Sequence, residues 1–349
     1  MMQSRVPAEW SEQSAVWITW PSQERWWSSC RLEALEAFAG LASKIAEYET
    51  VKINCPPEGA REAERLLRKA GCAMENVLFF PHETDDVWCR DCGAIFRLAG
   101  RKLEAVDFKY NAWGGKFEPF DRDDALAAKM AAACGADDIR INFTCEGGAV
   151  ETDGNGTLMT TKSVALNPNR NPGVSQSDAE EILALAYGAR RVLWLDDGLF
   201  NDDTDGHIDN IARFAPGGKI IASVCGPDNP SYESLKRNLQ ALKRASDADG
   251  VPYDVLELPL PDEPLFKTGA DGKREILPAG YANWLVVNGA VLAPSFGQPK
   301  SDARAREIIG SAFAGRKIEM IDSRIFLMEG GAVHCLTQQQ PAAQANPKI

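Results

Sequence analysis

Several features that would assign this 349-residue chain to a common class are scarce or missing. Only three histidines occur, His82, His207 and His334, so any chemistry that needs an imidazole must use one of them. No run approaches the ~18 uninterrupted apolar residues of a membrane helix. The first ten residues lack an apolar segment, which predicts that no secretory signal is present. We therefore expect a cytoplasmic protein with reduced cysteines and no membrane partner.

Motifs for nucleotides and metals are also missing. No Walker-type loop or Gly-x-Gly-x-x-Gly turn joins a strand to a helix, so no cofactor of that kind is expected. Cys89 and Cys92 form one Cys-x-x-Cys pair, but no second pair with zinc-like spacing follows, and metal binding is not expected. The net charge of −12 argues against nucleic acid and favours a cationic ligand.

The most informative feature that is present is a repeated phrase. Glu-Gly-Gly-Ala-Val occurs at residues 146–150 and again at residues 329–333, where His334 and Cys335 follow it. A single cysteine is more often a buried structural residue than a nucleophile. Its position after a duplicated phrase nevertheless suggests a repeat architecture with chemistry attached to one copy, and Cys335 is our candidate nucleophile.

A pattern of two hairpin strands, a helix and a further strand recurs along the chain. The turn Asp-Gly-Asn-Gly at residues 153–156 is a strong hairpin signal. The four predicted units, each given as hairpin, helix and strand, are 92–108, 124–134 and 139–143; 147–161, 178–187 and 191–195; 208–224, 232–246 and 253–258; and 284–294, 301–313 and 317–321.

Each end of the chain contains one lone strand, predicted at residues 14–21 and at residues 331–337. The first is followed by a helix at 32–48, a strand at 51–55, a helix at 59–70 and a strand at 77–80. Pairing of the two lone strands would complete a fifth unit and close a ring without exposed sheet edges. Repeats of this length indicate a propeller-like or solenoid array.

One domain is favoured, because no linker rich in Pro or Ser interrupts the pattern. It covers residues 1–340, and residues 341–349 are predicted to be a loose tail. An ordinary α/β sheet is the alternative, but a hairpin before each helix argues against a purely parallel fold.

Chemically suggestive side chains fall at one position of successive units, where each first hairpin strand is predicted to begin. They are Asp91, Glu146, His207, Asp209 and Cys335. In a ring, equivalent strand starts converge on the axis. A thiol, an imidazole and several carboxylates would then meet in one pocket.

The chemistry of these groups is coherent. A cysteine nucleophile needs a lowered pKa or a nearby base, and His207 can transfer protons near neutral pH. Asp209 is two residues from His207, so both side chains would face the same way on a strand. With Asp91, Asp209 could hold a planar guanidinium from two sides. His334 would point to the opposite face from Cys335 and is expected to pack behind the strand.

Each residue also has a plainer interpretation. Taken singly, the aspartates are more commonly turn caps, and His207 could be a satisfied interior histidine. Trp113, in the run Trp-Gly-Gly-Lys, could line the pocket or form a packed turn. The shared position in the repeats, together with Cys335, favours catalysis.

At these residues the sequence resembles the agmatine deiminase family of the guanidine-modifying superfamily, which also contains bacterial peptidylarginine deiminases. The matching segments follow one another over almost the whole chain. They are residues 7–10, 88–93, 111–116, 146–148, 166–172, 204–210, 293–297 and 334–341.

The resemblance implies an α/β fold, a five-bladed propeller (pentein) of ββαβ repeats with pseudo-fivefold symmetry. It implies Cys335 as nucleophile, His207 as acid and base, Glu146 as the carboxylate that orients His207, and Asp91 with Asp209 as guanidinium ligands. The expected reaction hydrolyses agmatine to N-carbamoylputrescine and ammonia through a covalent thiouronium intermediate, as in putrescine biosynthesis. No cofactor or metal is implied.

For the rest of the substrate, the resemblance implies that Asp203 lies near the distal amine. Trp88 and Trp113 are expected to bind the substrate as well. The sequence departs from the family pattern in two places here, with Asp203 where Glu is usual and Asp205 where Asn is usual. Expected partners are a small cationic guanidine and, as one option for assembly, a second copy of the chain.

Three other functions stay open at this point. A deiminase of free or peptidyl arginine would need an Arg or an open cleft, whereas the acidic run at residues 202–205 favours an amine tail. A ring-shaped binding protein without activity would not need the thiol, imidazole and carboxylates. A cysteine hydrolase of amides would have no use for paired acids around a cation.

Overall fold

The computed structural model describes residues 4–24, 26–269 and 272–343 and has a mixed α/β fold of several small sheets. Four of these sheets have three strands each and share one topology. An antiparallel hairpin comes first, and its second strand pairs in parallel with the third strand. Their strands are β4 (Ile95–Ala99), β5 (Lys102–Lys109) and β6 (Asp137–Thr144); β7 (Val150–Thr152), β8 (Thr157–Thr161) and β9 (Arg191–Leu195); β10 (Ala212–Ala215), β11 (Lys219–Val224) and β12 (Asp254–Pro259); and β15 (Leu285–Val287), β16 (Ala290–Ser295) and β17 (Lys317–Asp322). The predicted order of hairpin, helix and strand is therefore confirmed in these four units.

The two ends of the chain meet in a four-stranded sheet. Its order is β18 (Thr337–Pro341), β1 (Gln13–Thr19), β2 (Thr50–Asn54) and β3 (Val77–Phe80). β1 pairs antiparallel with β18 and parallel with β2, which repeats the topology of the other four sheets. The predicted pairing of the two chain ends is confirmed.

The prediction of a strand at residues 331–337 is wrong. The chain forms a turn there, and β18 begins only at Thr337. The backbone N–H groups of His334 and Cys335 donate to the side-chain Oδ1 of Asn283, so they are not available to a strand ladder. β18 ends at Pro341, the first residue of the predicted tail, and residues 344–349 of that tail lie outside the described residues.

The helices connect the strands within and between units. The longer ones are α1 (Arg31–Ala46), α2 (Pro57–Lys69), α6 (Leu126–Cys134), α8 (Gln176–Tyr187), α9 (Tyr232–Leu242) and α10 (Pro299–Ala312). The short ones are α3 (Cys89–Cys92), α4 (Ala112–Gly115), α5 (Asp121–Asp124), α7 (Lys162–Ala165) and α11 (Arg324–Leu327), with the 3₁₀ turns η1 (Met74–Asn76), η2 (Gly147–Ala149) and η3 (Ile208–Asn210).

Helix α8 shows how local sequence sets these boundaries. Ser175 accepts a hydrogen bond from the backbone N–H of Asp178, whose side chain bonds back to Ser175 in a capping box. The helix therefore starts at Gln176, two residues earlier than predicted. It ends where Gly188 adopts a left-handed conformation with φ 71°.

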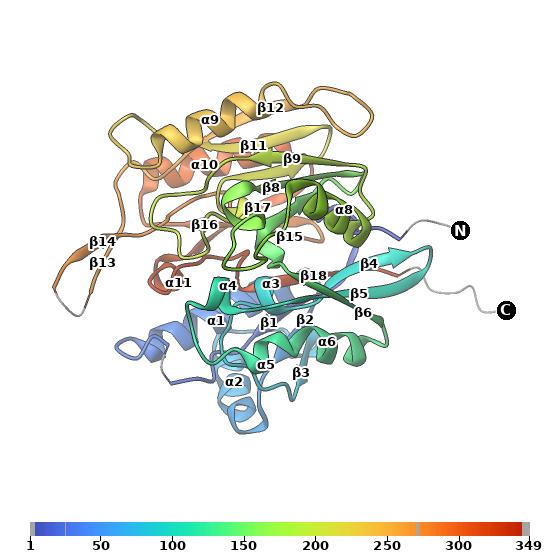
Figure 1. The fold of residues 1–349 in the computed structure, drawn as a ribbon. Coiled ribbons are helices and arrows are strands. Elements are labelled where there is room, and N and C mark those ends of the chain that lie inside the picture. The colour runs from blue at the N-terminus through green and yellow to red at the C-terminus, as the bar shows by residue number, and fades with distance from the viewer. Residues whose placement is uncertain (1–3, 25, 270–271, 344–349) are drawn as a thin grey trace.

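The helices lie mainly on the outside of the molecule. In Figure 1, α9 and α10 lie along the top of the view and α2, α5 and α6 along the bottom, with strands between them. Helices α6, α8, α9 and α10 each pack on a strand of their own unit. The hairpin β13 (Phe266–Thr268) and β14 (Arg274–Ile276), which projects on the left of Figure 1, was not predicted.

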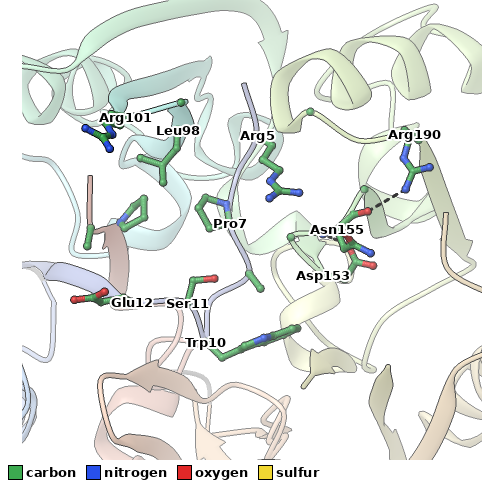
Figure 2. Close-up of a pocket in the computed structure, with 17 residues that line it drawn as sticks. Arg5, Pro7, Trp10, Ser11, Glu12, Leu98, Arg101, Asp153, Asn155 and Arg190 are labelled. Carbon is green, nitrogen blue, oxygen red and sulfur yellow. Dashed lines mark hydrogen bonds between the residues drawn. The ribbon is translucent and has the colours of Figure 1, made fainter. Parts of the chain in front are cut away.

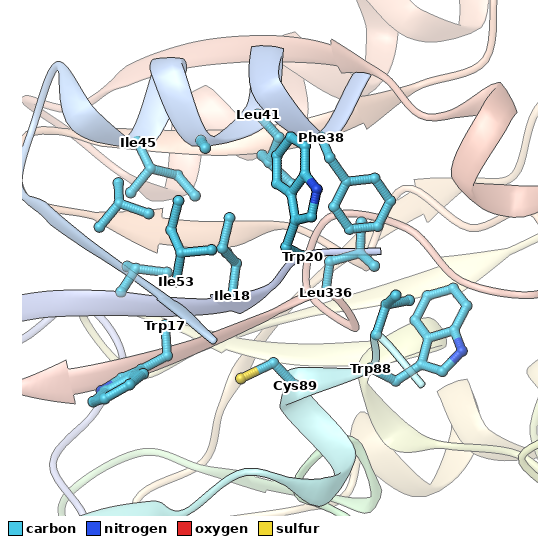
Figure 3. Close-up of a cluster of buried hydrophobic side chains, with 14 of the residues drawn as sticks. Trp17, Ile18, Trp20, Phe38, Leu41, Ile45, Ile53, Trp88, Cys89 and Leu336 are labelled. Atoms are coloured by element: carbon cyan, nitrogen blue, oxygen red, sulfur yellow. The ribbon is translucent and has the colours of Figure 1, made fainter. Parts of the chain in front are cut away.

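An apolar cluster links the sheet of the chain ends to α3, to α6 and to the β15–β16 hairpin. Figure 3 shows Trp20 and Phe38 of this cluster, together with Trp88 and Leu336. Leu336 and Phe38 are fully buried, and burial of such side chains is worth about 1.5–3 kcal/mol each. Cys335 belongs to the same cluster, so the candidate nucleophile is anchored by the core.

Among the described residues, no helix combines the length and the apolar character needed to span a bilayer.

Candidate active site

The candidate residues lie in short turns directly before the first strand of each unit, not on the strands as predicted. Asp91 is in α3, Glu146 precedes η2, His207 precedes η3, Asp209 is in η3, and Cys335 is in the turn before β18. The argument that His207 and Asp209 share one face of a strand is therefore wrong. A tight turn directs both toward the same point instead.

Gly148 lies at that point. A Cβ atom added to it would be 2.6 Å from Nδ1 of His207, 2.8 Å from Oδ1 of Asp91 and 3.0 Å from Oδ2 of Asp209. The backbone N–H of Gly148 also donates to Oδ1 of Asp91 at 3.1 Å. Three side chains from two units thus surround a glycine of a third unit, and only a residue without a side chain leaves them room.

His207 is fully buried between two carboxylates. Its Nδ1 is 3.6 Å from Oδ1 of Asp91, and its Nε2 is 3.6 Å from Oε2 of Glu146, and neither ring nitrogen has a hydrogen-bond partner. Burial disfavours the charged ring, but Asp91, Glu146 and Asp209 outweigh it and raise the pKa of His207 to about 9. The imidazole therefore carries its proton at neutral pH.

Glu146 is held in place by Arg170. The Nε of Arg170 donates to Oε1 at 2.8 Å and to Oε2 at 3.0 Å, and both side chains are buried. Burial favours the neutral acid, but Arg170 and His207 outweigh it and lower the pKa of Glu146. Sequence reasoning noted Arg170 only as part of a matching segment and gave it no role.

Asp91 receives a hydrogen bond from Nε1 of Trp113 at 3.0 Å. Burial raises the pKa of Asp91 to about 6, with a further contribution from the nearby Asp209 and Glu146 carboxylates and an opposing one from His207. Trp113 adopts a positive φ of 55°, an uncommon conformation for a bulky residue. The tryptophan is thus a partner of the candidate acid and not simply a packed turn.

Cys335 is buried, and its Sγ accepts a hydrogen bond from Nδ2 of Asn283 at 3.0 Å. Its Sγ also lies 3.8 Å from Oδ2 of Asp209. Burial, together with Asp209 and Asp91, raises the pKa of the Cys335 thiol well above its ordinary value. Asn283 was missed by sequence reasoning, although it directly precedes the fourth hairpin, as the other candidates precede theirs.

Asp209 is bound from the side by His334. Nδ1 of His334 lies 2.7 Å from Oδ2 of Asp209, whereas Oδ1 of Asp209 is buried without a partner. Burial favours the neutral acid, but His334 and His207 outweigh it and lower the pKa of Asp209. His334 therefore does more than fill space behind Cys335.

A pocket leads from the surface to two of these groups. Cys335 and Asp91 line it together with aromatic side chains and further acids. The other lining residues include Trp26, Trp88, Trp113, Phe117, Asp203, Glu329 and Lys267. Asp203 is exposed, as expected for a residue at the mouth of the pocket, and Trp88 is buried within it.

Asp205, one of the two departures from the family pattern, forms ion pairs with two cationic side chains. Its carboxylate binds Nζ of Lys116 at 2.6 Å and Nη1 of Arg170 at 2.6 Å. Burial opposes the charge, but Lys116 and Arg170 outweigh it and lower the pKa of Asp205. This acid is therefore not available to a ligand.

A broader hollow lies elsewhere, between the N-terminal segment and the β7–β8 turn. Figure 2 shows Arg5 and Trp10 on one side of it and Asp153, Asn155 and Arg190 on the other. None of its lining residues is a cysteine or a histidine, so the thiol chemistry cannot be located there. In the part of the chain that the structure describes, no group of three or more His, Cys, Asp or Glu side chains could hold a metal ion.

The comparisons with known proteins extend over nearly the whole chain. An agmatine deiminase from Ectopseudomonas mendocina is 36% identical over 358 residues, which cover 97% of this chain and 96% of that one. An Enterococcus faecalis structure described as agmatine deiminase catalysing its reaction has a TM-score of 0.90 at 29% identity, with 97% and 96% of the two chains covered. A cysteine-to-serine variant of the C. jejuni agmatine deiminase with substrate bound has a TM-score of 0.86 at 30% identity, again with 97% and 96% covered.

The family model for Porphyromonas-type peptidyl-arginine deiminase matches residues 5–341. This match includes the five units and all the turns that carry the candidate residues. The chain therefore belongs to the Porphyromonas-type peptidyl-arginine deiminase family.

Proposed function

We propose that this protein is an agmatine deiminase, which hydrolyses agmatine to N-carbamoylputrescine and ammonia. One observation carries the proposal: a buried thiol, an imidazole and two carboxylates meet around Gly148 and Cys335. The relatives support the same substrate, because many of them bear this name at a similar level of identity over 97% of the chain.

Substrate binding follows from the charges of the pocket. Asp91 and Asp209 take the guanidinium, and the unpartnered Oδ1 of Asp209 is available to one of its N–H groups. Trp88 and Trp113 line the path of the alkyl chain. Asp203, exposed at the pocket, takes the distal ammonium.

The first chemical step needs the Cys335 thiolate. Burial, together with the neighbouring Asp209 and Asp91, holds the resting group as a thiol, and the positive guanidinium offsets the charge of the two acids when it binds. The thiol proton then leaves to solvent, and the sulfur attacks the central carbon of the guanidinium. The C–S bond forms as the π electrons move to nitrogen, which produces a tetrahedral intermediate.

His207 serves two of the later proton transfers. Because it is protonated at neutral pH, it can donate to the departing nitrogen, so that the C–N bond breaks and ammonia leaves. The thiouronium intermediate remains bound to Cys335. His207, now neutral, takes one proton from water, whose oxygen bonds to the same carbon. The C–S bond then breaks, the remaining hydroxyl proton passes to the sulfur, and the ureido product leaves with Cys335 restored as a thiol. Glu146, fixed by Arg170, holds the ring in place.

The arrangement of the units supports a five-bladed propeller that forms a single catalytic domain. The five sheets that share the hairpin-plus-parallel-strand topology each contribute a turn residue to one place: Asp91, Glu146, His207, Asn283 and Cys335. Contacts link these residues across units, from Asn283 to Cys335 at 3.0 Å and from His207 to both acids at 3.6 Å. Turns from five units can meet in this way when the units surround a common axis.

Free arginine is the second candidate substrate, and one observation favours it. Lys267 lines the same pocket, so one cation lies among the carboxylates and could pair with the carboxylate of an amino acid. In that case a Lys267→Ala variant would lose turnover of arginine and keep turnover of agmatine.

The test is a direct comparison of substrates. The purified protein is incubated with agmatine, arginine and a peptidyl-arginine ester, and released ammonia is measured. We expect ammonia from agmatine in preference to the other two. Ammonia only from arginine would transfer the assignment to that substrate, and none from any of them would leave a binding protein without activity.

Assembly as a homodimer and a cytoplasmic location complete the proposal and rest on the sequence alone. Light scattering on the purified protein tests the first, because a monomer would give a mass near 38.1 kDa. Fractionation of the source cells tests the second.

A further inference from the structure

A row of buried charged side chains extends behind the candidate nucleophile, from Asp209 to Glu9 in the N-terminal segment. His334 lies between these two acids. Its Nδ1 lies 2.7 Å from Oδ2 of Asp209, and its Nε2 lies 3.0 Å from Oε2 of Glu9. Oε2 of Glu9 also accepts a hydrogen bond from Nη2 of Arg213 at 2.5 Å, which adds Arg213 to the row of charged side chains. The backbone N–H of Val286 donates to the other oxygen of Glu9 at 2.6 Å.

Both ring nitrogens of His334 thus face carboxylate oxygens. A neutral imidazole has one N–H and one lone pair, so it could donate to only one of the two acids. Its lone pair would then face the oxygen of the other acid at hydrogen-bond distance. The pKa values of Glu9 and Asp209 are both lowered, and between two ionised carboxylates only the imidazolium form, with two N–H groups, satisfies both contacts.

The charges around His334 balance in this form. The buried charged groups that face it or continue its contacts are Asp209, Glu9, Glu151, Arg90 and Arg213. With His334 charged, these three acids meet three cations. Uncompensated buried charge is strongly unfavourable. The sixth neighbour, Cys335, is a thiol in the resting site.

We propose that His334, held as an imidazolium between Glu9 and Asp209, is a positioning residue that engages Oδ2 of Asp209 and leaves Oδ1 for the substrate guanidinium. This inference rests on the proposed function for the identity of the substrate. It gives the N-terminal Glu9 a role in the reaction, although Glu9 touches neither the thiol nor the pocket that contains it. His334 acts on the substrate only through Asp209.

The local backbone supports this role. Oδ1 of Asn283 accepts the N–H groups of both His334 and Cys335, at 3.0 and 3.3 Å. The thiol and the imidazolium are therefore fixed as one unit. Because Asp209 is bound to that unit, its carboxylate is held 3.8 Å from Sγ of Cys335.

Two substitutions separate the contacts of His334. The amide nitrogen of Asn reaches roughly the place of Nδ1, and that of Gln reaches roughly the place of Nε2. His334→Asn thus retains a donor for Asp209, whereas His334→Gln retains a donor for Glu9 only. The matched control is His82→Asn, because His82 is half-buried, does not line the pocket and is bonded through Nδ1 to Asn54.

For agmatine, loss of the charge-assisted bond to Asp209 in His334→Gln should lower kcat/KM by about ten- to a hundred-fold, mainly through a higher KM. His334→Asn should lose clearly less, and His82→Asn should match the wild type. Equal losses in the two His334 variants, or losses in kcat alone, would overturn the positioning role.

A measurement on the unaltered protein keeps the inference testable if the variants fold poorly or if agmatine is not the substrate. Nitrogen-15 NMR of labelled histidine distinguishes a ring with two N–H groups from a neutral ring. We expect the resonances of His334 to report two protonated nitrogens in the resting protein. A neutral His334 would overturn the inference whatever the substrate is, whereas two N–H groups without ammonia from agmatine would refute only the proposed function.

Discussion

The substitution Gly148→Ala is the sharpest test of the convergence described above. The φ of Gly148 is not in the left-handed region, so alanine meets no backbone strain there, and the only change is one methyl group. That methyl would lie between His207, Asp91 and Asp209, which are the proposed acid–base residue and the proposed guanidinium ligands.

The required displacements follow from the distances. Ordinary van der Waals contact begins at 3.4 Å, so Nδ1 of His207 must move by 3.4 − 2.6 = 0.8 Å, Oδ1 of Asp91 by 3.4 − 2.8 = 0.6 Å and Oδ2 of Asp209 by 3.4 − 3.0 = 0.4 Å. Misplacement of reacting groups by about 1 Å can cost about 100-fold in rate. We therefore expect kcat/KM for agmatine to fall by about 100-fold.

The assay measures N-carbamoylputrescine formed from agmatine, and thermal unfolding is recorded on the same samples. Gly40→Ala is the matched control, because Gly40 lies inside α1 and its added Cβ would meet nothing within 4 Å. That control should keep full activity and gain about 1 kcal/mol in the free energy of unfolding. A Gly148→Ala protein with wild-type kcat/KM would refute the convergence of the three side chains.

Three further predictions concern the same site. Cys335→Ser should abolish turnover but still bind agmatine in calorimetry, and full turnover would remove the proposed nucleophile. Arg170→Gln leaves the buried Glu146 without its arginine and leaves Asp205 with Lys116 alone, so the free energy of unfolding should fall by about 3–5 kcal/mol in denaturant titrations. A loss below about 1 kcal/mol would contradict the role of the Arg170–Glu146 ion pair. The fold raises the pKa of His207 from 6.5 to about 9, so the contribution of its charge to stability is complete below about pH 6.5 and is lost as the pH rises through about 9. The difference in free energy of unfolding between wild type and His207→Gln should therefore shrink from pH 6 to pH 9.5. A difference that stays constant over this range would contradict the prediction.

The sequence was sufficient for much of the fold because its signals are local. Turn residues and apolar periodicity identify the hairpin, helix and strand of the four internal units, and the lone strands at the two ends indicate their pairing. Local sequence signals gave a wrong prediction where tertiary contacts compete with the backbone hydrogen bonds of a β-sheet. The amides of His334 and Cys335 bind Asn283, so the predicted strand at residues 331–337 is a turn. The β13–β14 hairpin is short, and its two strands, Phe266–Thr268 and Arg274–Ile276, carry little apolar alternation.

The sequence by itself also determined the chemical inventory of the site. It supplied one cysteine after a duplicated phrase, one histidine at the same repeat position and the acids that accompany them. Their spacing along the chain is enough to associate them, because a repeated unit places equivalent positions in equivalent surroundings.

Only the tertiary structure decided how these groups are charged and which partners they use. Arg170 binds Glu146 and Asp205, Asn283 binds the thiol of Cys335, and His334 bridges two acids, although these partners are up to 325 residues apart. Burial, with Asp209 and Asp91, raises the pKa of Cys335, whereas the pKa of His207 reaches about 9 because Asp91, Glu146 and Asp209 outweigh the opposing effect of burial. Such effects depend on distances in space, which a pattern along the chain does not contain.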